Sequence, residues 1–471
     1  MTGPSRESLA LPARALDVLA VVLVVFGVSL VFTGGFRTEV AGLRLSVTSW
    51  VRPVGLALLL ALVRHWWWRT PAMPVAVGRA VRTWFGRPAT RAAWPVFVAT
   101  RLGVLLVGLL AVFAIGYPPP GDAPMRMYGS ELANLPVRYD AGWYADIAVH
   151  GYRIETHATD LQQNFAFFPA YPLLMRYTSL LLGRDVILAG MVISFASFFG
   201  ALVFLFRLAR QSLDDERAAT AVALLASYPF AVFYSAPYSE SLFLLAMLGA
   251  WYHYQGNRLW PAAFWGLLAG LARPNGCFLS VPLGLMALAP LWRDGRLQRP
   301  EAGWASIADR LAVAAMPGIG MLIYSAFIYQ LTGDPLQWAK LHAAWGRSYV
   351  ALDTFLASQV DQVQTLGLYG VTASRTPDVI NAAGVAFALA TAWPVYRRLG
   401  LPALTLILLT VLPPLANGGF LSMGRVTSVL FPSFIWLASA LPARHRTAWI
   451  AAFAILQGFV AVMFFTWRPV F

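Results

Sequence analysis

Cysteine, lysine and charged side chains are scarce in this chain of 471 residues. Cys277 is the sole cysteine, which excludes an internal disulfide and a cysteine zinc cluster. Lys340 is the sole lysine, and such a strong preference for arginine suggests a GC-rich genome and hence a bacterial source. Charged residues make up only 12% of the chain, whereas 59% of it is hydrophobic. No soluble domain needs that much apolar surface, so the composition predicts a membrane protein.

Motifs of nucleotide, zinc and serine-hydrolase chemistry are also missing. The chain has no G-x-x-x-x-G-K-[ST] for ATP, no H-E-x-x-H for zinc and no G-x-S-x-G elbow. His150, His157 and Asp160 are close in sequence but lack a recognisable ligand spacing, so no metal or other cofactor is expected. Without a nucleotide site, the energy for chemistry outside the membrane must come from an activated lipid.

Apolar runs recur along the chain, and helices are the elements that satisfy their own backbone groups in lipid. The pattern predicts an all-α polytopic membrane protein with about 13 spans. The expected spans are 15–33, 46–63, 94–116, 186–206, 218–235, 241–254, 259–271, 277–291, 311–329, 379–395, 402–417, 425–441 and 447–466.

The net charge of +14 would suggest nucleic acid as a partner in a soluble chain. Here the arginines cluster between apolar runs, where the positive-inside rule explains them and places the N-terminus in the cytoplasm. No A-x-A site follows the first run, so we expect an uncleaved anchor. Residues 1–93 are interpreted as a two-helix extension with an arginine-rich linker, and 94–471 as a core with external loops at 117–184 and 330–378.

The first external loop carries RYDAGWYADIAVHGY at residues 138–152. In a helix, Asp140, Trp143 and Tyr144 share one face at i, i+3 and i+4. Asp146 points elsewhere, roughly 240° round the helix, so the two carboxylates do not form an acid/base pair. One carboxylate among aromatic rings suits a base beside a sugar ring, and the alternative is that Asp140 caps a short surface helix.

Further along this loop, NFAFFPAYPLLMR (164–176) is apolar but interrupted by Pro169 and Pro172. We interpret it as a re-entrant or interfacial piece, because proline breaks helices. It could form the wall of a groove for a lipid chain, or simply an amphipathic helix on the membrane surface.

Charged side chains next to other predicted spans fall on the outer side as well. Glu240 could be a helix cap, an acceptor for sugar hydroxyls or an ion-pair partner that holds an arginine. Arg273 in LARPNG and Arg425 in SMGR run against the positive-inside bias, and either could grip a lipid phosphate or snorkel to ordinary headgroups. The segment TGDPLQWAKLHAAWGR (332–347) could lie on the membrane or bring Lys340 or Arg347 to a phosphate. Convergence of these motifs on one face indicates a single external active site.

Taken together and in this order, the motifs resemble the PIG-V type mannosyltransferases, which are relatives of GPI mannosyltransferase II. The resemblance covers about residues 94–441 and rests on RYDAGWYADIAVHGY, NFAFFPAYPLL, YPFAVFYSAPYSESLF, ARPNG, GDPLQWAKLHAAWGR and SMGRVTSVLFP. It implies a GT-C type fold, a polyprenyl- or dolichyl-phosphate sugar as donor, and an essential acid in the first external loop. Asp140 matches that acid, although Tyr139 stands where the family commonly has tryptophan. The composition looks bacterial, so the GPI acceptor is not carried over.

The resemblance leads to an inverting mannosyl transfer from polyprenyl-phosphate-mannose to a lipid-linked or glycan hydroxyl on the non-cytoplasmic face, with Asp140 as general base. Membrane lipids are the surroundings, and neither a nucleotide nor a metal is needed. The remaining candidate residues are Arg273, Arg425, Arg138 and Lys340 for the donor phosphate, Trp143, Tyr144, Asp146, Glu240 and Asn164 for the sugar or acceptor, and Phe167, Phe168 and Tyr171 for the lipid groove. Two alternatives stay open: a flippase for lipid-linked sugars without transfer chemistry, and a transferase for a sugar other than mannose.

Overall fold

The computed structural model describes residues 11–33, 36–40, 43–47, 49–67, 73–154, 160–293, 296–297 and 303–470. The chain divides into two compact units, Met1–Arg91 with Tyr177–Asp185 and Ala92–Arg176 with Val186–Phe471. The first division falls within two residues of the expected boundary between residues 93 and 94, but the grouping of residues 177–185 with the extension was not expected. His157 lies outside the described residues, so its place beside His150 stays untested.

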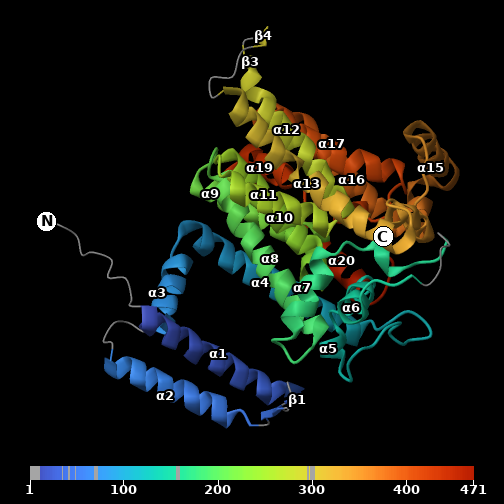
Figure 1. The fold of residues 1–471 in the computed structure, drawn as a ribbon. Helices are drawn as coiled ribbons and strands as arrows, with labels where there is room; N and C mark the ends of the chain where they lie inside the picture. Colours follow the sequence, from blue (N-terminus) through green and yellow to red (C-terminus); the bar gives the residue numbers. More distant parts are fainter. Residues whose placement is uncertain are drawn as a thin grey trace. The chain divides into compact units, whose positions relative to one another are not determined.

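The first unit is built on two apolar helices, α1 (Leu11–Thr33) and α2 (Val51–Trp67), which pack against each other (Figure 1). Between them lies an antiparallel hairpin of β1 (Phe36–Val40) and β2 (Leu43–Val47), and α3 (Met73–Phe85) follows α2. The expected span from residue 46 was therefore wrong at its start. The alternation of apolar and polar residues in LRLSV (Leu43–Val47) is typical of a strand. This stretch therefore forms β2 and is not part of the helix that follows.

The second unit is almost entirely helical. Its elements are α4 (Pro88–Ala114, which begins just before the unit), α5 (Glu131–Asn134), α6 (Ala141–His150), η1 (Asn164–Ala166), α7 (Ala170–Ser179, which ends beyond it), α8 (Val186–Ala209), α9 (Asp215–Ser227), η2 (Pro229–Ser235), α10 (Glu240–Gln255), α11 (Leu259–Ala272), η3 (Pro274–Leu279), α12 (Ser280–Leu288), η4 (Ala289–Leu291), β3 (Trp292–Arg293), β4 (Arg296–Leu297), α13 (Gly303–Thr332), α14 (Gln337–Lys340), η5 (Leu341–Trp345), α15 (Leu352–Ser374), α16 (Thr376–Leu399), α17 (Leu401–Ala416), α18 (Met423–Ser428), α19 (Phe431–Ala440) and α20 (Ala443–Phe465), where η marks a 3₁₀ helix.

Within the described residues, six helical segments are long and apolar enough to cross a membrane, and a seventh is gained if α9 and η2 count as one bent span. The six are Pro88–Ala114, Val186–Ala209, Pro274–Leu291, Gly303–Thr332, Thr376–Leu399 and Ala443–Phe465. This confirms the predicted all-α, multi-pass membrane protein. The expected count of about 13 is not confirmed, because other predicted spans form shorter helices such as α11 and α17.

Two of the expected spans are broken rather than continuous. The run 218–235 divides into α9 and η2, which meet at an angle of 77° at Pro229. The run 425–441 divides into α18 and α19, with Pro432 in the first turn of α19. Proline lacks a backbone N–H and disfavours the helical conformation of the residue before it, so both breaks have a local cause. The second break leaves Arg425 on the six-residue helix α18.

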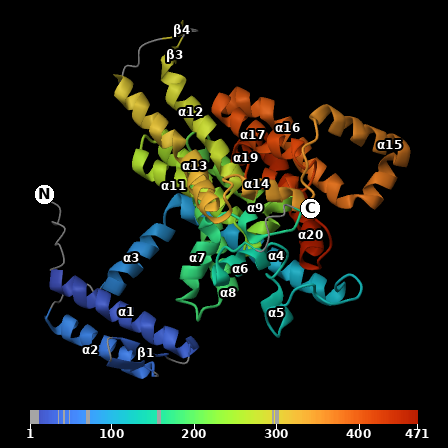
Figure 2. The same ribbon diagram turned by 45° about the vertical axis from the view of Figure 1, so that its right-hand side comes forward.

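Helix α10 packs against α8 and α11, and α11 packs against α13 (Figure 1). Helices α11 and α13 also lie side by side in Figure 2. Glycines make the contact of α11 with α13 close: a Cβ on Gly270 would lie 1.9 Å from the carbonyl oxygen of Pro317, and one on Gly320 would lie 2.5 Å from that of Leu267. Small residues are the usual means of bringing membrane helices this near. The crossing fixes the end of α11, which leads directly into Arg273.

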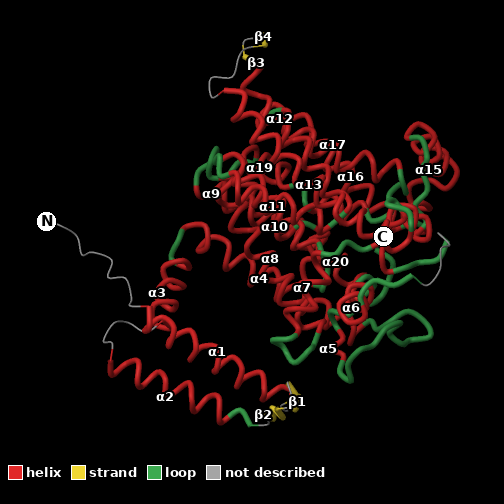
Figure 3. The backbone as a smooth tube through the Cα atoms, in the orientation of Figure 1, coloured by secondary structure: helices red, strands yellow, loops and turns green. Residues whose placement is uncertain are grey.

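Figure 3 shows long loop segments between α4 and α8, with α5, α6 and α7 set among them. The stretch broken by Pro169 and Pro172 forms η1 and the ten-residue α7, so it is not a full span, as predicted. Its position relative to the membrane surface stays a prediction.

Candidate functional site

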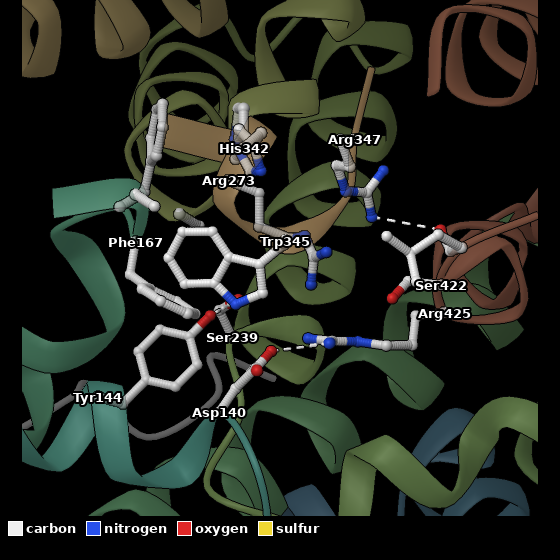
Figure 4. Close-up of a pocket in the computed structure, with 15 residues that line it drawn as sticks. Asp140, Tyr144, Phe167, Ser239, Arg273, His342, Trp345, Arg347, Ser422 and Arg425 are labelled. Atoms are coloured by element: carbon white, nitrogen blue, oxygen red, sulfur yellow. Dashed lines mark hydrogen bonds and ion pairs between the residues drawn. The ribbon is translucent and has the colours of Figure 1, made fainter. Parts of the chain in front are cut away.

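A pocket of about 140 Å³ in the second unit collects side chains from six separate segments (Figure 4). They come from α6 and the residue before it, from the end of η1, from the approach to α10, from the junction of α11 with η3, from η5 and the two residues after it, and from α18 and the two residues before it. The lining residues are Asp140, Tyr144, Ala166, Phe167, Phe168, Ser239, Ala272, Arg273, Pro274, His342, Trp345, Arg347, Leu421, Ser422 and Arg425. Residues of the expected motifs therefore meet in one pocket, whereas the side of the membrane that it faces stays a prediction.

Asp140 lies at the start of α6 and is about one sixth exposed at its side chain. Its carboxylate makes no capping hydrogen bond to the helix, so the alternative that it serves as a simple helix cap is wrong. Instead, Oδ2 accepts a hydrogen bond of 2.7 Å from Nη1 of Arg425. The backbone N–H of Asp140 donates to the hydroxyl of Tyr238 at 3.1 Å, and Tyr139 before it has a left-handed φ of 44°. This turn directs the carboxylate into the pocket.

Arg425 connects two carboxylates. Besides its bond to Asp140, its Nε and Nη2 lie 2.7 and 2.6 Å from Oε1 of Glu240. The guanidinium carbon also lies 5.1 Å from the ring centre of Phe233 and 4.9 Å from that of Tyr238. Ion pairing and ring contacts together hold this cation in one orientation at the pocket wall.

Glu240 is fully buried at the start of α10 and forms an ion pair with Arg273 as well as with Arg425. It does not line the pocket. Of the three interpretations open for Glu240, the arrangement supports the ion-pair partner, and the expected contact with sugar hydroxyls has no support. A buried carboxylate needs such partners, because isolated burial of a charge is costly.

Arg347 is a third guanidinium on the pocket wall. Its Nη2 donates to the backbone oxygen of Leu421 at 3.3 Å, and among the described residues it forms no ion pair with a carboxylate. Burial lowers the pKa of Arg347 to about 10, with further lowering by Arg425 and Arg273, so it remains charged at neutral pH. With Asp140 and Glu240 ionised, the three arginines leave this cluster with one positive charge in excess.

His342 lies beside Arg347 and is neutral at physiological pH. Burial, followed by the fields of Arg347 and Arg273, lowers the pKa of its imidazole to about 4. It therefore lines the pocket as an uncharged hydrogen-bonding ring and adds nothing to the excess charge.

Two of the four cations expected at the donor phosphate are elsewhere. Arg138 is buried, and its guanidinium donates to the backbone oxygens of Phe465, Asn134 and Val137. It fastens the loop before α6 to the end of α20. Lys340 is more than half exposed and pairs with Asp334 on the surface. Neither lines the pocket, which corrects the expectation for both.

The aromatic residues of the first loop separate into lining and supporting positions. Tyr144 lines the pocket, and its hydroxyl lies 2.7 Å from that of Ser239. Trp143 stands behind the wall, where its ring stacks on Phe167 at 5.8 Å and meets Trp345 at 5.9 Å. Trp143 thus supports the side chains that could meet a sugar and does not itself line the cavity.

The expected lipid-groove residues are also divided. Phe167 and Phe168 line the pocket, but Tyr171 is fully buried and its hydroxyl donates to the backbone oxygen of Gly190 at 2.9 Å. Its hydroxyl also lies 2.7 Å from that of Ser194 on α8. Tyr171 is therefore a core residue between α7 and α8, which corrects its assignment to the groove.

Asp146 and Asn164 form a network outside the pocket. Asp146 pairs with Arg153 and His150, and its Oδ2 accepts from Nδ2 of Asn164 at 2.9 Å. This network ties α6 to η1 and so positions Phe167 indirectly. Neither residue lines the cavity, so their expected contact with the sugar or acceptor is not supported.

Several lining residues were missed from the sequence: Ser239, His342, Trp345 and Ser422, with Arg347 considered but set behind Lys340. Their signal is adjacency, since each belongs to a motif already singled out. Among the described residues, no group of three or more histidine, cysteine, aspartate or glutamate side chains could hold a metal ion.

Comparison with known proteins bears on the same segments. The family model described as Mannosyltransferase (PIG-V) matches residues 125–289, a stretch that includes Asp140, Glu240 and Arg273. GPI mannosyltransferase 2 of Schizosaccharomyces pombe is 30% identical over 159 residues, which is 33% of this chain and 32% of the relative. The chain thus aligns with about one third of the length of this curated relative.

Among solved structures, two crystal structures of the Archaeoglobus fulgidus oligosaccharyltransferase are similar to this chain. One, tethered to an acceptor peptide, has a TM-score of 0.42 at 13% identity, and the match covers 82% of this chain and 56% of the oligosaccharyltransferase chain. The other, with zinc and sulfate, has a TM-score of 0.38 at 13% identity, and the match covers 77% of this chain and 53% of the oligosaccharyltransferase chain. The sequence relationship is the more specific finding, and through residues 125–289 it relates this chain to the PIG-V mannosyltransferases, as the motifs predict.

Proposed function

We propose that the protein is a mannosyltransferase that moves mannose from polyprenyl-phosphate-mannose to a hydroxyl of a lipid-linked or glycan acceptor on the non-cytoplasmic face. The observation that carries the proposal is one pocket lined by Asp140 and by three arginines, with Asp140 and Arg273 inside the segment related to mannosyltransferases. A carboxylate and clustered guanidinium groups are the two kinds of group that transfer from a phospho-sugar requires.

In this mechanism the acceptor oxygen attacks C1 of the mannose while its proton passes to the carboxylate of Asp140. The bond from C1 to the phosphate oxygen breaks, its electron pair leaves with the polyprenyl phosphate, and the configuration at C1 is inverted. General-base help of this kind contributes roughly 10²–10⁴-fold to the rate. The contact with Arg425 orients the carboxylate of Asp140 in the pocket before the acceptor arrives.

The arginine cluster serves the leaving group. A phosphodiester carries one negative charge, which equals the excess positive charge of the three arginines over Asp140 and Glu240. Arg273 and Arg425 are already oriented by the buried carboxylate of Glu240, so they need little rearrangement as charge develops. Preorganised charge in a site with little water is usually the largest contribution to catalysis. No divalent metal is needed in this scheme, and transfer is expected to persist in excess EDTA.

The test is transfer of labelled mannose from polyprenyl-phosphate-mannose into a lipid extract by purified wild-type protein and by Asp140→Asn. We expect the substitution to lower the turnover number by at least 10²-fold, because the amide cannot take the proton. The matched control is Asp361→Asn, which changes an exposed aspartate on α15 and should leave transfer unchanged.

Two results would contradict the proposal. Full transfer by Asp140→Asn would show that Asp140 is not the general base. No transfer by the wild type with any polyprenyl-phosphate sugar would show that the protein does not catalyse this reaction. In the second case, translocation of the lipid-linked sugar across reconstituted vesicles would identify a flippase.

A further inference from the structure

A second and larger cavity, of about 360 Å³, adjoins the pocket and has a different character. Four residues belong to the walls of both: Arg273, Pro274, His342 and Arg347. The rest of its lining is mainly apolar and comes largely from η3, α13, α14, α17 and α18; it includes Cys277, Met321, Trp338, Ala339 and Val426. Its volume lies in the range of about 300–1,000 Å³ that is usual for small-molecule sites.

The shared wall carries the positive charge that the cluster leaves unbalanced. Arg273 is neutralised by Glu240, whereas Arg347 forms no ion pair with a carboxylate among the described residues. Arg347 therefore stands between a pocket that contains the carboxylate of Asp140 and a cavity whose lining contains no acidic side chain. An anion bound to Arg347 can extend one substituent into each space.

We propose that this second cavity binds the first isoprene units of the donor, with its phosphate on Arg347 and its sugar in the pocket beside Asp140. The inference rests on the proposed function, because it assigns the two arms of the same phosphodiester. The sugar carries hydroxyl groups and suits the pocket that contains Asp140. The prenyl chain is a hydrocarbon and suits the cavity with the mainly apolar lining. Each methylene that enters an apolar site contributes about fourfold in affinity, so an apolar cavity beside the phosphate selects a prenyl chain.

This assignment moves the prenyl site away from the residues expected from the sequence. Phe167 and Phe168 line the first pocket and not the second cavity. The ring of Phe167 lies 5.2 Å from that of Tyr144, where the sugar or the acceptor would meet it. Trp338 and Met321, on α14 and α13, take their place as walls for the hydrocarbon.

The first experiment measures equilibrium binding of labelled polyprenyl phosphate, without a sugar, to the full purified chain in detergent. We expect Arg347→Ala to weaken binding at least tenfold, because the phosphate loses its charged partner. Val426→Trp should weaken it by filling the apolar cavity, and Ala339→Phe tests the same cavity from another element. The matched control is Arg375→Ala, which removes an exposed arginine at the end of α15 and should leave binding unchanged.

The second experiment locates the ligand with a reporter that the chain already contains. Cys277 is the only cysteine and lines the second cavity, so methyl methanethiosulfonate labels one position there. Saturating polyprenyl phosphate should slow this labelling at least fivefold in the wild type. The prenyl alcohol at the same concentration should protect far less, because it lacks the group that Arg347 binds.

The proposal is overturned if polyprenyl phosphate binds Arg347→Ala as tightly as wild type, or if saturating ligand leaves the labelling rate of Cys277 unchanged. Equal protection by the alcohol and the phosphate would also overturn it. A monodisperse gel-filtration peak for each variant shows that a loss of binding is not a loss of folding, and Arg347→Lys should recover part of the affinity. Because the ligand carries no sugar, these results do not depend on transfer, and a failure of the proposed function is detected separately.

Discussion

Arg425 and Asp140 are 285 residues apart in the chain, yet Nη1 of the arginine donates to Oδ2 of the aspartate at 2.7 Å. The same guanidinium meets Glu240 through Nε and Nη2. One planar cation therefore fixes the distance between a carboxylate that faces the pocket and one that is buried behind it.

Arg425→Lys is predicted to lose the simultaneous contact with Asp140 and Glu240. A lysine ammonium is a single point and cannot donate to both carboxylates in the fork geometry of a guanidinium. We expect kcat/KM for mannosyl transfer to fall at least tenfold, with a lower melting temperature. Arg375→Lys, an exposed exchange of the same kind, should change neither. Wild-type activity in Arg425→Lys would show that charge alone, without orientation, is sufficient.

Glu240→Gln is predicted to destabilise the protein as well as the site. It leaves Arg273 and Arg425 without their shared buried anion, and removal of one partner of a buried ion pair costs about 3–5 kcal/mol. The fraction of monodisperse protein after heating, measured by gel filtration, should fall at a lower temperature than for wild type.

The control for that variant is Asp378→Asn, because this aspartate and its partner Arg375 are both exposed. Exposed pairs contribute little, so its melting profile should match that of the wild type. Equal melting profiles for the two variants would contradict the buried ion-pair role of Glu240.

His342 is predicted to make stability depend on pH below neutrality. Its folded-state pKa is lowered to about 4, below the ordinary value of 6.5, so the unfolded chain binds the proton more readily between these values. The free energy of unfolding should thus fall as pH drops from 6.5 towards 4, by at most about 1.4 kcal/mol per pH unit. Above pH 6.5 this contribution is complete.

The measurement is the melting temperature of wild type and of His342→Gln across pH 4 to 7.5. The difference between the two should change with pH only in the acidic part of this range. A constant difference would mean that the imidazole is not buried in its neutral form.

Gly424→Ala is predicted to disrupt the site through packing. A Cβ at residue 424 would lie 2.0 Å from the ring of Phe230, and the backbone N–H donates to Oδ1 of Asn381 at 2.6 Å. The clash should displace α18, and Arg425 with it, so both transfer and thermal stability should decrease. Gly284→Ala on α12 is the control: nothing lies within 4 Å of its Cβ, and alanine favours the helix. Undiminished transfer by Gly424→Ala would show that α18 can shift without loss of the site.

Local features of the sequence determined the elements that depend on local physics. The apolar run of α8 predicts a helix from residue 186, and the prolines at 169 and 172 predict that the next stretch upstream is not a full span. Asp140 could be selected as well, because an acid among aromatic residues in RYDAGWY combines the chemistry and the family motif in one segment. These inferences require only neighbouring residues.

Tertiary structure alone decided which charged side chains meet. Lys340 and Arg347 belong to the same motif, yet Lys340 pairs with Asp334 on the surface while Arg347 enters the pocket. The chain turns between them at Gly346, which has a φ of 78°, and a one-dimensional pattern does not give the direction of a side chain after such a turn. The same limit applies to Glu240, whose partners lie 33 and 185 residues away and become neighbours only when α10, α11 and α18 pack together.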